Sequence, residues 1–369
     1  RRLEQVLFRV GRTSKQEQKQ IMNDIQRAIA VSFPNADAQI VQDVVLGFRP
    51  RQKTRKLLVD LSGQDEGRYV VKVGNEEDLK AELAAWNKCW PAGLRHDVVL
   101  MCLEPRYSDV EAGSGKLVSL VYEDAQQSIG MDRTVSLEKA FLDSVRVLDS
   151  VRVDEPSVTS VATVIAQVLH RLGHLLYRSA RPHEPAELFD SHPAPKKMDH
   201  HSGNPDIRFN GRHWLESSLY VWDQRQPAIE TRRDAMTSIG RGSGNDRFFD
   251  AAEYLTYVLD AVRGGEPVED FIPRMLRGKA HGDLHGRNVL VGLVGGEAHW
   301  PALFDFEDMA DDNLVSWDFV KLETELKLRA YPILFKTVKP HLFARRISEF
   351  ETKLSRETED RRRTGHWPA

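Results

Sequence analysis

Residues 68–73 of this 369-residue chain read Arg-Tyr-Val-Val-Lys-Val. Alternation of this kind, rich in β-branched residues, is typical of a β-strand. The following stretch, Asn75 to Trp86, carries Leu79, Leu83 and Trp86 at spacings of four and three, which predicts a helix. Acidic residues at its start favour the helix through its dipole. We therefore expect a strand that leads directly into a helix.

A second pattern of apolar runs predicts a β-hairpin. Val289-Leu290-Val291 and residues 300–304 are short apolar runs, and Gly295-Gly296 between them suits a tight turn. Asn288 precedes the first run and Asp305 follows the second. A hairpin would bring these two polar side chains to the same end.

A long amphipathic helix is predicted over Val161 to Tyr177. Its apolar stripe consists of Ile165, Val168, Leu169, Leu172, Leu175 and Leu176. His170 and His174 lie at helical spacing on it and could suggest a metal pair. Because no third ligand is near in the sequence, we interpret them as core or flanking histidines. Further helical patterns occupy Lys15–Ala30, Phe248–Val262 and Arg345–Arg363.

These elements predict an α+β fold. Residues 1–35 form a helical extension, residues 36–125 a small β-rich lobe that includes a strand at 117–122, and residues 126–369 a larger, mainly helical lobe. A hydrophobic content of 41% over 369 residues is ample for two cores.

Charge and cysteine content narrow the function classes. The formal net charge of −3 gives no general attraction to nucleic acid or anionic membranes, and no apolar stretch is long enough to span a bilayer. Cys89 and Cys102 offer neither a disulfide framework nor zinc-ligand spacing, so we interpret them as buried thiols. No signal peptide is recognisable, although the chain opens on Arg1. We expect a cytoplasmic protein that binds neither nucleic acid nor membrane.

The residues His281 to Asn288 carry the chemistry. They read His-Gly-Asp-Leu-His-Gly-Arg-Asn, and Asp283 and Asn288 have the spacing of a kinase catalytic loop. In phosphoryl transfer one carboxylate orients a hydroxyl, while an amide oxygen and a second carboxylate hold Mg²⁺ on the nucleotide. Asp305 would supply the second carboxylate. The alternative interpretation is purely structural. In it Asp283 caps a turn of its loop, and Asp305 lies at the end of a strand and faces water.

The stretch from His281 to Val291, together with Leu303 to Asp308, resembles the aminoglycoside phosphotransferase and choline kinase branch of the protein-kinase-like superfamily. It also resembles, more distantly, phosphotransferase-like domains of bacterial signalling and conflict systems. The resemblance is sharp over about residues 280–328 and diffuse elsewhere. It implies a bilobal kinase-like fold with ATP and Mg²⁺ as cofactors.

The resemblance implies a role for each matching residue. Asp283 would be the catalytic base, Asn288 and Asp305 the Mg²⁺ ligands, and His281 and Asp318 structural supports of the loop. His285 and Glu307 are further candidates, and Asp308 is either close to the chemistry or solvated. In the small lobe, Lys72 would bind the α- and β-phosphates and Glu82 would hold it, with Glu77 as a competitor for that pairing. The segment at Glu123 and Ala125 would be the hinge whose backbone binds adenine.

One segment departs from the family pattern. Only Gly47 stands where a glycine-rich phosphate loop is expected, and the same region carries Arg49, Arg51, Lys53, Arg55 and Lys56. These side chains could contact phosphate through charge-assisted hydrogen bonds, or they could form a solvated basic turn.

About 155 residues separate the hinge from Asp283. Within them, Arg181–Gly211 predicts a long irregular loop, a candidate lid. Its four histidines could suggest a metal site, but their irregular spacing favours a polar surface. Gly240–Asp246 is glycine-rich and could order a phosphate, although a helix connector is the plainer interpretation.

Three functions are compatible with these features. The first is transfer of the ATP γ-phosphate to a hydroxyl of a small molecule or protein. The second is a non-catalytic nucleotide sensor or scaffold of a bacterial signalling or defence protein, suggested by the glycine-poor loop. The third is nucleotidyl transfer on the same fold. The sequence names neither the acceptor nor the oligomeric state.

Overall fold

The computed structural model divides the chain into two compact units. The first comprises residues 1–182 and 276–327, and the second residues 183–275 and 328–369. The structure describes residues 23, 26–28, 30–34, 42–49, 54–61, 67–89, 106–112, 115–124, 133–147, 156–184, 192–193, 208–209, 260–261, 264–267, 270 and 274–365. The predicted boundaries of the extension and the two lobes stay a prediction.

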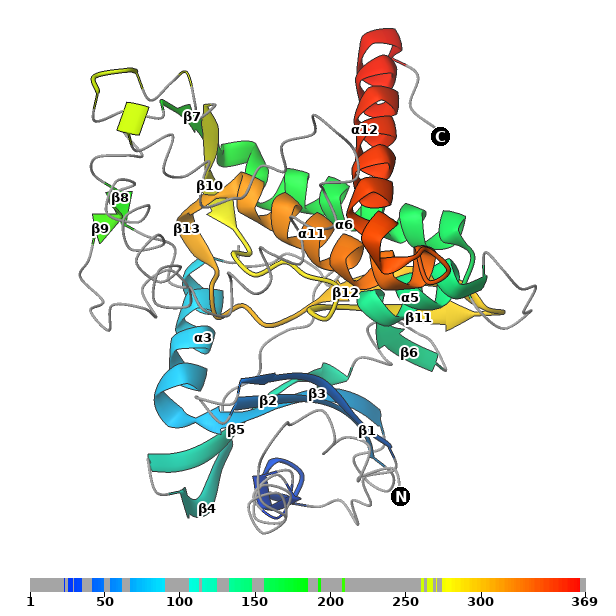
Figure 1. Cartoon of the computed structure of the whole chain (residues 1–369). Helices are drawn as coiled ribbons and strands as arrows, with labels where there is room; N and C mark the ends of the chain where they lie inside the picture. The colour runs from blue at the N-terminus through cyan, green and yellow to red at the C-terminus, as the bar shows by residue number, and fades with distance from the viewer. Residues whose placement is uncertain are drawn as a thin grey trace. The chain divides into compact units, whose positions relative to one another are not determined.

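A five-stranded antiparallel sheet opens the first unit (Figure 1). Its spatial order is β1-β2-β3-β5-β4. The strands are β1 (Gln42–Arg49), β2 (Thr54–Leu61), β3 (Gly67–Asn75), β4 (Arg106–Ala112) and β5 (Gly115–Asp124). The strands predicted at 68–73 and 117–122 are confirmed as parts of β3 and β5.

Helix α3 (Glu76–Cys89) follows β3 directly, as predicted. The Asn75 side chain accepts a hydrogen bond of 2.8 Å from the backbone N–H of Asp78, which satisfies one of the free donors at the helix start. Glu76, Glu77 and Asp78 place negative charge in its first turn, where the helix dipole favours it. Leu79 and Trp86 are buried.

The two faces of the sheet have different partners because successive residues of a strand point to opposite sides. One face packs against residues that precede the sheet: Ala28 and Phe33 join Val71, Val73 and Val121 in one core cluster. The other face carries Val70, Leu120 and Tyr122 into the main core. Lys72 alternates with Val71 and Val73, so it lies on this second face.

The rest of the first unit surrounds the predicted hairpin. Its elements are β6 (Arg133–Ser136), α5 (Leu137–Val147), α6 (Val158–Leu175), η2 (Tyr177–Ser179), β7 (Arg181–His183), β10 (Met275–Ala280), β11 (Val289–Val294), β12 (Glu297–Leu303), β13 (Ala310–Leu314) and α11 (Val315–Leu334). The end of α11 after Lys327, His183 of β7 and Met275 of β10 are counted with the second unit. Two three-stranded sheets have the orders β12-β11-β6 and β13-β10-β7. Figure 1 shows α5 and α6 beside the hairpin of β11 and β12.

The hairpin confirms the prediction made from its apolar runs. Gly295 and Gly296 have φ of 54° and 85°, which is the left-handed backbone of a two-residue turn. Val289 pairs with Leu303 at the open end. The backbone N–H of Phe304 donates to the carbonyl of Asn288 at 3.2 Å. Asn288 and Asp305 therefore leave the hairpin side by side.

Helix α6 buries the stripe that its periodicity predicts. Val161, Val164, Val168 and Leu172 are buried, and Ile165, Leu169 and Leu175 pack partly buried against the same core. The Ser157 side chain caps the helix by accepting from the N–H of Ser160 at 3.1 Å. His170 and His174 are exposed, with ring centroids 4.6 Å apart, so they flank the core and do not belong to it.

The second unit contains a long terminal helix, α12 (Pro340–Thr364), which ends at Gly365 in the left-handed conformation. It also contains the short strands β8 (His192–Pro193) and β9 (Arg208–Phe209). The segment predicted as an irregular loop at 181–211 thus includes β7, β8 and β9, and its other residues are mostly outside the described ones. The segments 15–22 and 240–246, and nearly all of 248–262, are outside them too.

The described elements form an α+β fold, as predicted. A small antiparallel sheet with one helix precedes a mainly helical part that carries the hairpin. Cys89 is a buried thiol, and Cys102 is outside the described residues. No described helix is long and apolar enough to cross a membrane.

Replacing Phe33 by alanine should destabilise the first unit by about 3 kcal/mol, because it removes a buried ring from the back of the sheet. Thermal unfolding measures the effect. Val320→Ala is the control, since Val320 of the same unit is 52% exposed and its truncation should cost much less. Equal losses in both variants would contradict this packing.

Candidate active site

Lys72 of β3 and Glu82 of α3 form a buried ion pair. The sequence left Glu77 as a competitor, but Glu77 is exposed. Glu82 also accepts from the hydroxyl of Tyr122 and from the backbone N–H of Phe306. Burial raises the pKa of Glu82 to about 7, although Lys72 opposes the shift. The strand lysine and the helix glutamate therefore meet as the resemblance implies.

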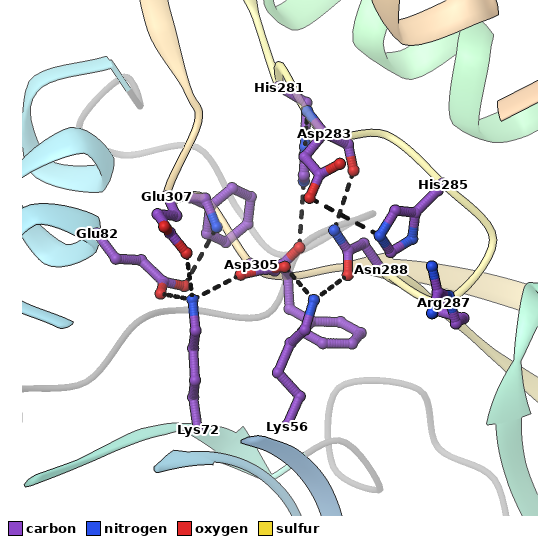
Figure 2. Close-up of polar contacts among 12 residues, drawn as sticks. Lys56, Lys72, Glu82, His281, Asp283, His285, Arg287, Asn288, Asp305 and Glu307 are labelled. Atoms are coloured by element: carbon purple, nitrogen blue, oxygen red, sulfur yellow. Dashed lines mark hydrogen bonds and ion pairs between the residues drawn. The ribbon is translucent and has the colours of Figure 1, made fainter. Parts of the chain in front are cut away.

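Asp305 lies between two lysines, as Figure 2 shows. Its Oδ1 is 2.8 Å from Lys72 Nζ, and its Oδ2 pairs with Lys56 Nζ. Burial alone would raise the pKa of Asp305, but Lys56 and Lys72 outweigh it and hold the pKa well below its usual range. Asp305 has a φ of 69°. Residues other than glycine seldom adopt this left-handed backbone conformation. This turn aims its carboxylate at the sheet.

A third carboxylate, that of Glu307, is 3.0 Å from Lys72 Nζ. Oxygens of Glu82, Asp305 and Glu307 lie within 4.8 Å of one another and could together hold a cation. The Lys72 ammonium already contacts all three, so it accounts for their approach. Burial alone would lower the pKa of Lys72, but these carboxylates outweigh it and raise the pKa well above its usual value.

Helix α11 holds the backbone of the loop before Asp283. The two oxygens of Asp318 accept hydrogen bonds of 2.8 Å from the backbone N–H groups of His281 and Gly282, and Tyr177 donates its hydroxyl at 2.9 Å. The His281 ring accepts from the N–H of Asp283 at Nδ1 and donates from Nε2 to the Phe304 carbonyl at 3.1 Å. Both residues thus lie where they support the loop.

The Asn288 side chain is oriented by two contacts. Its amide nitrogen donates to the carbonyl of Asp283 at 3.0 Å, and its oxygen accepts from Lys56 Nζ at 2.7 Å. The oxygens of Asn288 and Asp305 therefore converge on one cationic atom (Figure 2). The structure brings these two predicted metal ligands together.

Asp283 has a partner that the sequence analysis did not single out. Lys321 of α11 forms an ion pair with its Oδ1. His285 Nε2 lies 3.8 Å from Oδ2, and burial lowers the pKa of His285 well below its usual value, so its ring is neutral near pH 7. The sequence does contain a clue to Lys321, because it follows Asp318 by three residues and so shares its helix face.

Lys56 was named from the sequence as one of five basic side chains that could contact phosphate, but its contacts with Asn288 and Asp305 were not foreseen. It was grouped with a basic segment for which a solvated turn was one interpretation. That interpretation is wrong for Arg55 and Lys56, which lie in β2 and are only 5% and 8% exposed. Lys56 pairs in register with Lys72 on the neighbouring strand, so both side chains leave the same face. Asp308, for which a solvated position was considered, is also buried.

Other parts of the predicted site are outside the described residues. Glu123 belongs to β5, but its side chain is not described, and neither is Ala125. The same holds for Arg51 and Lys53 and for the side chain of Arg49. The adenine-binding role of the hinge stays a prediction.

Comparison with known proteins gives similarity to solved structures only. No family model matches, and no curated protein matches. The apo form of a thermostable mutant of aminoglycoside phosphotransferase APH(4)-Ia is 13% identical, with 86% of this chain and 83% of that chain covered and a TM-score of 0.35. The GDP complex of aminoglycoside 2′-phosphotransferase-IIIa is 14% identical, with coverages of 86% and 85% and a TM-score of 0.36. A microcompartment-associated aminopropanol kinase is 15% identical, with coverages of 84% and 81% and a TM-score of 0.33.

These solved structures are of aminoglycoside phosphotransferases and of a kinase. At such low identities and TM-scores they say nothing about substrate. The interpretation of the site therefore depends on its own geometry.

Replacing Gly282 by alanine should destabilise the protein by several kcal/mol. Gly282 has a φ of 78°, and an added Cβ would lie 2.1 Å from the carbonyl oxygen of Asp308, so the loop backbone must move. Gly173→Ala in α6 is the matched control, because a Cβ there meets nothing within 4 Å and alanine favours the helix. Thermal unfolding should separate the two variants, and equal melting temperatures would contradict the described loop.

Proposed function

We propose that this chain is an ATP- and Mg²⁺-dependent phosphotransferase that moves the γ-phosphate to a hydroxyl group of a small molecule or protein. The supporting observation is the convergence of Asn288, Asp305 and Lys72, which come from different elements. In kinases, one lysine on a strand, one asparagine and one aspartate meet the nucleotide phosphates and their metal. The cytoplasmic location expected from the sequence is part of this proposal.

The donor set fits Mg²⁺. Asn288 Oδ1 and Asp305 Oδ2 both face Lys56 Nζ, so a cation can be shared between them, and amide and carboxylate oxygens suit this hard ion. When bound, the metal would neutralise charge on the phosphates during transfer. Lys72 would bind the α- and β-phosphates, and Glu82 would hold its ammonium in place.

Asp283 would orient the acceptor hydroxyl and receive its proton. The hydroxyl oxygen forms a bond to the γ-phosphorus while the bond from that phosphorus to the bridging oxygen breaks, which releases ADP. The ion pair with Lys321 fixes the Asp283 carboxylate, and the bonds of Asp318 to His281 and Gly282 fix its backbone. Most of the rate enhancement would come from such positioning and electrostatics.

Asp283→Asn should abolish phosphate transfer while the affinity for nucleotide changes little, because Asp283 faces the acceptor and not the base or ribose. Turnover is measured with [γ-³²P]ATP across a panel of alcohols and proteins, and affinity by calorimetry. Glu323→Gln is the control, since the Glu323 side chain is 60% exposed on the same helix as Lys321. Undiminished transfer by Asp283→Asn would remove its assignment as the base.

The same assays separate the alternatives. Tight nucleotide binding by the wild type without transfer to any acceptor would favour a non-catalytic sensor. A product heavier by AMP instead of by phosphate would indicate nucleotidyl transfer. Mass spectrometry of the product distinguishes them directly.

Asp305→Asn should weaken Mn²⁺ binding by roughly tenfold or more, since it removes the anionic ligand and leaves two amides. Mn²⁺ binding is followed by electron paramagnetic resonance, with Asp360→Asn on the exposed end of α12 as the control. Unchanged Mn²⁺ affinity in Asp305→Asn would place the metal elsewhere.

A further inference from the structure

The ammonium of Lys56 occupies the position where the proposed metal would bind. Its Nζ donates to Asn288 Oδ1 at 2.7 Å and pairs with Asp305 Oδ2. These are the oxygens that the proposed function gives to Mg²⁺. One atom cannot accept closely from an ammonium and bind a metal along the same direction. Lys56 and the metal therefore compete for this pair of ligands.

Lys56 is also held where a phosphate would lie. It projects from β2 beside Lys72, to which it is paired in register, and Figure 2 shows the two side chains rising toward Asp305 from the same side. The metal in this class of site bridges phosphate oxygens, so the phosphates lie within one coordination shell of the metal position. A lysine has a flexible four-carbon stem and can withdraw by that distance without leaving its strand.

The small number of glycines before Lys56 favours a phosphate-binding role for this lysine. Residues 47–56 contain one glycine where backbone N–H groups of a glycine-rich loop would otherwise approach the phosphates. A second lysine offers up to three N–H donors and a positive charge in their place. Its present partners are one carboxylate, shared with Lys72, and one neutral amide. A triphosphate would be a stronger partner than these.

We propose that Lys56 competes with the divalent cation for Asn288 and Asp305, and that it becomes a second phosphate-binding lysine once metal and nucleotide have taken its place. This inference rests on the proposed function. It adds two roles for Lys56. The lysine does part of the phosphate binding that a glycine-rich loop does in other kinases, and it stays paired with the metal ligands until metal and nucleotide bind. Metal alone should accordingly bind weakly, and metal with nucleotide should bind tightly.

The test uses Lys56→Met, which keeps the length and apolar stem but removes the ammonium. Titration with MnCl₂ alone should show an affinity increased by about tenfold, the factor that corresponds to one lost charge-assisted hydrogen bond. Titration with a non-hydrolysable ATP analogue and Mn²⁺ should show nucleotide affinity reduced by about tenfold or more. Lys80→Met is the matched control, because Lys80 on α3 is exposed and pairs with Glu76, and it should change neither affinity.

Lys321→Met separates specific competition from a general effect of removing positive charge. Lys321 pairs with Asp283, and no contact to Asn288 or Asp305 is described for it, so its loss should raise Mn²⁺ affinity less than the loss of Lys56. An equal rise in both variants would overturn the competition. A purely structural ion pair would lower the melting temperature of Lys56→Met without moving either affinity, and this result would also overturn the proposal.

The outcomes distinguish this inference from the proposed function. A wild type that binds the analogue with Mn²⁺, with unchanged affinities in Lys56→Met, would defeat the inference and leave the phosphotransferase intact. A wild type that binds no nucleotide would defeat both. The same titrations are repeated with Lys56→Gln, whose polar side chain suits the buried position. A change of affinity caused only by misfolding of the methionine variant would then be recognised.

Discussion

The site depends on how buried charge is paired. Lys56 and Lys72 face Glu82, Asp305 and Glu307 in a largely water-free setting, and an unpaired ion there would cost several kcal/mol. Asp305 connects the two lysines, because each of its carboxylate oxygens pairs with one lysine ammonium. Removing Asp305 would take one carboxylate partner from both lysines at once, so this residue holds both ammonium groups in position. The cluster contains three carboxylates and two lysines. This excess of acidic groups favours the binding of a further cation.

This pairing also connects distant parts of the chain. The contact from Lys56 to Asp305 spans 249 residues of sequence, and that from Lys72 spans 233. Strands β2 and β3 therefore have to be in register, and the hairpin has to be closed, before any of these ion pairs can form. Because α3 supplies Glu82 and also touches β13, the helix joins the sheet to the part of the unit that carries the loop of Asp283.

Local patterns predicted most of the elements around the site, because their causes are local. Gly295-Gly296 between two apolar runs closes a hairpin, and a strand followed by acidic residues and spaced leucines gives β3 and α3. The contacts of Lys56 with Asn288 and Asp305, and of Lys321 with Asp283, could not be predicted because they depend on residues far away in the sequence. Whether Lys56 faces water or the core is decided by its register with Lys72, and a cluster of basic residues in sequence gives no hint of that register. Lys321 becomes notable only when Asp318 is known to face the loop.

Helix α11 contacts the loop of Asp283 through two of its side chains. Asp318 fixes the backbone at His281 and Gly282, and one turn later Lys321 pairs with the carboxylate of Asp283. A single helix face therefore sets both where the loop runs and where its carboxylate points. Two side chains at a spacing of three lie on the same face of a helix. The position of α11 therefore bears on both the loop backbone and the carboxylate of Asp283.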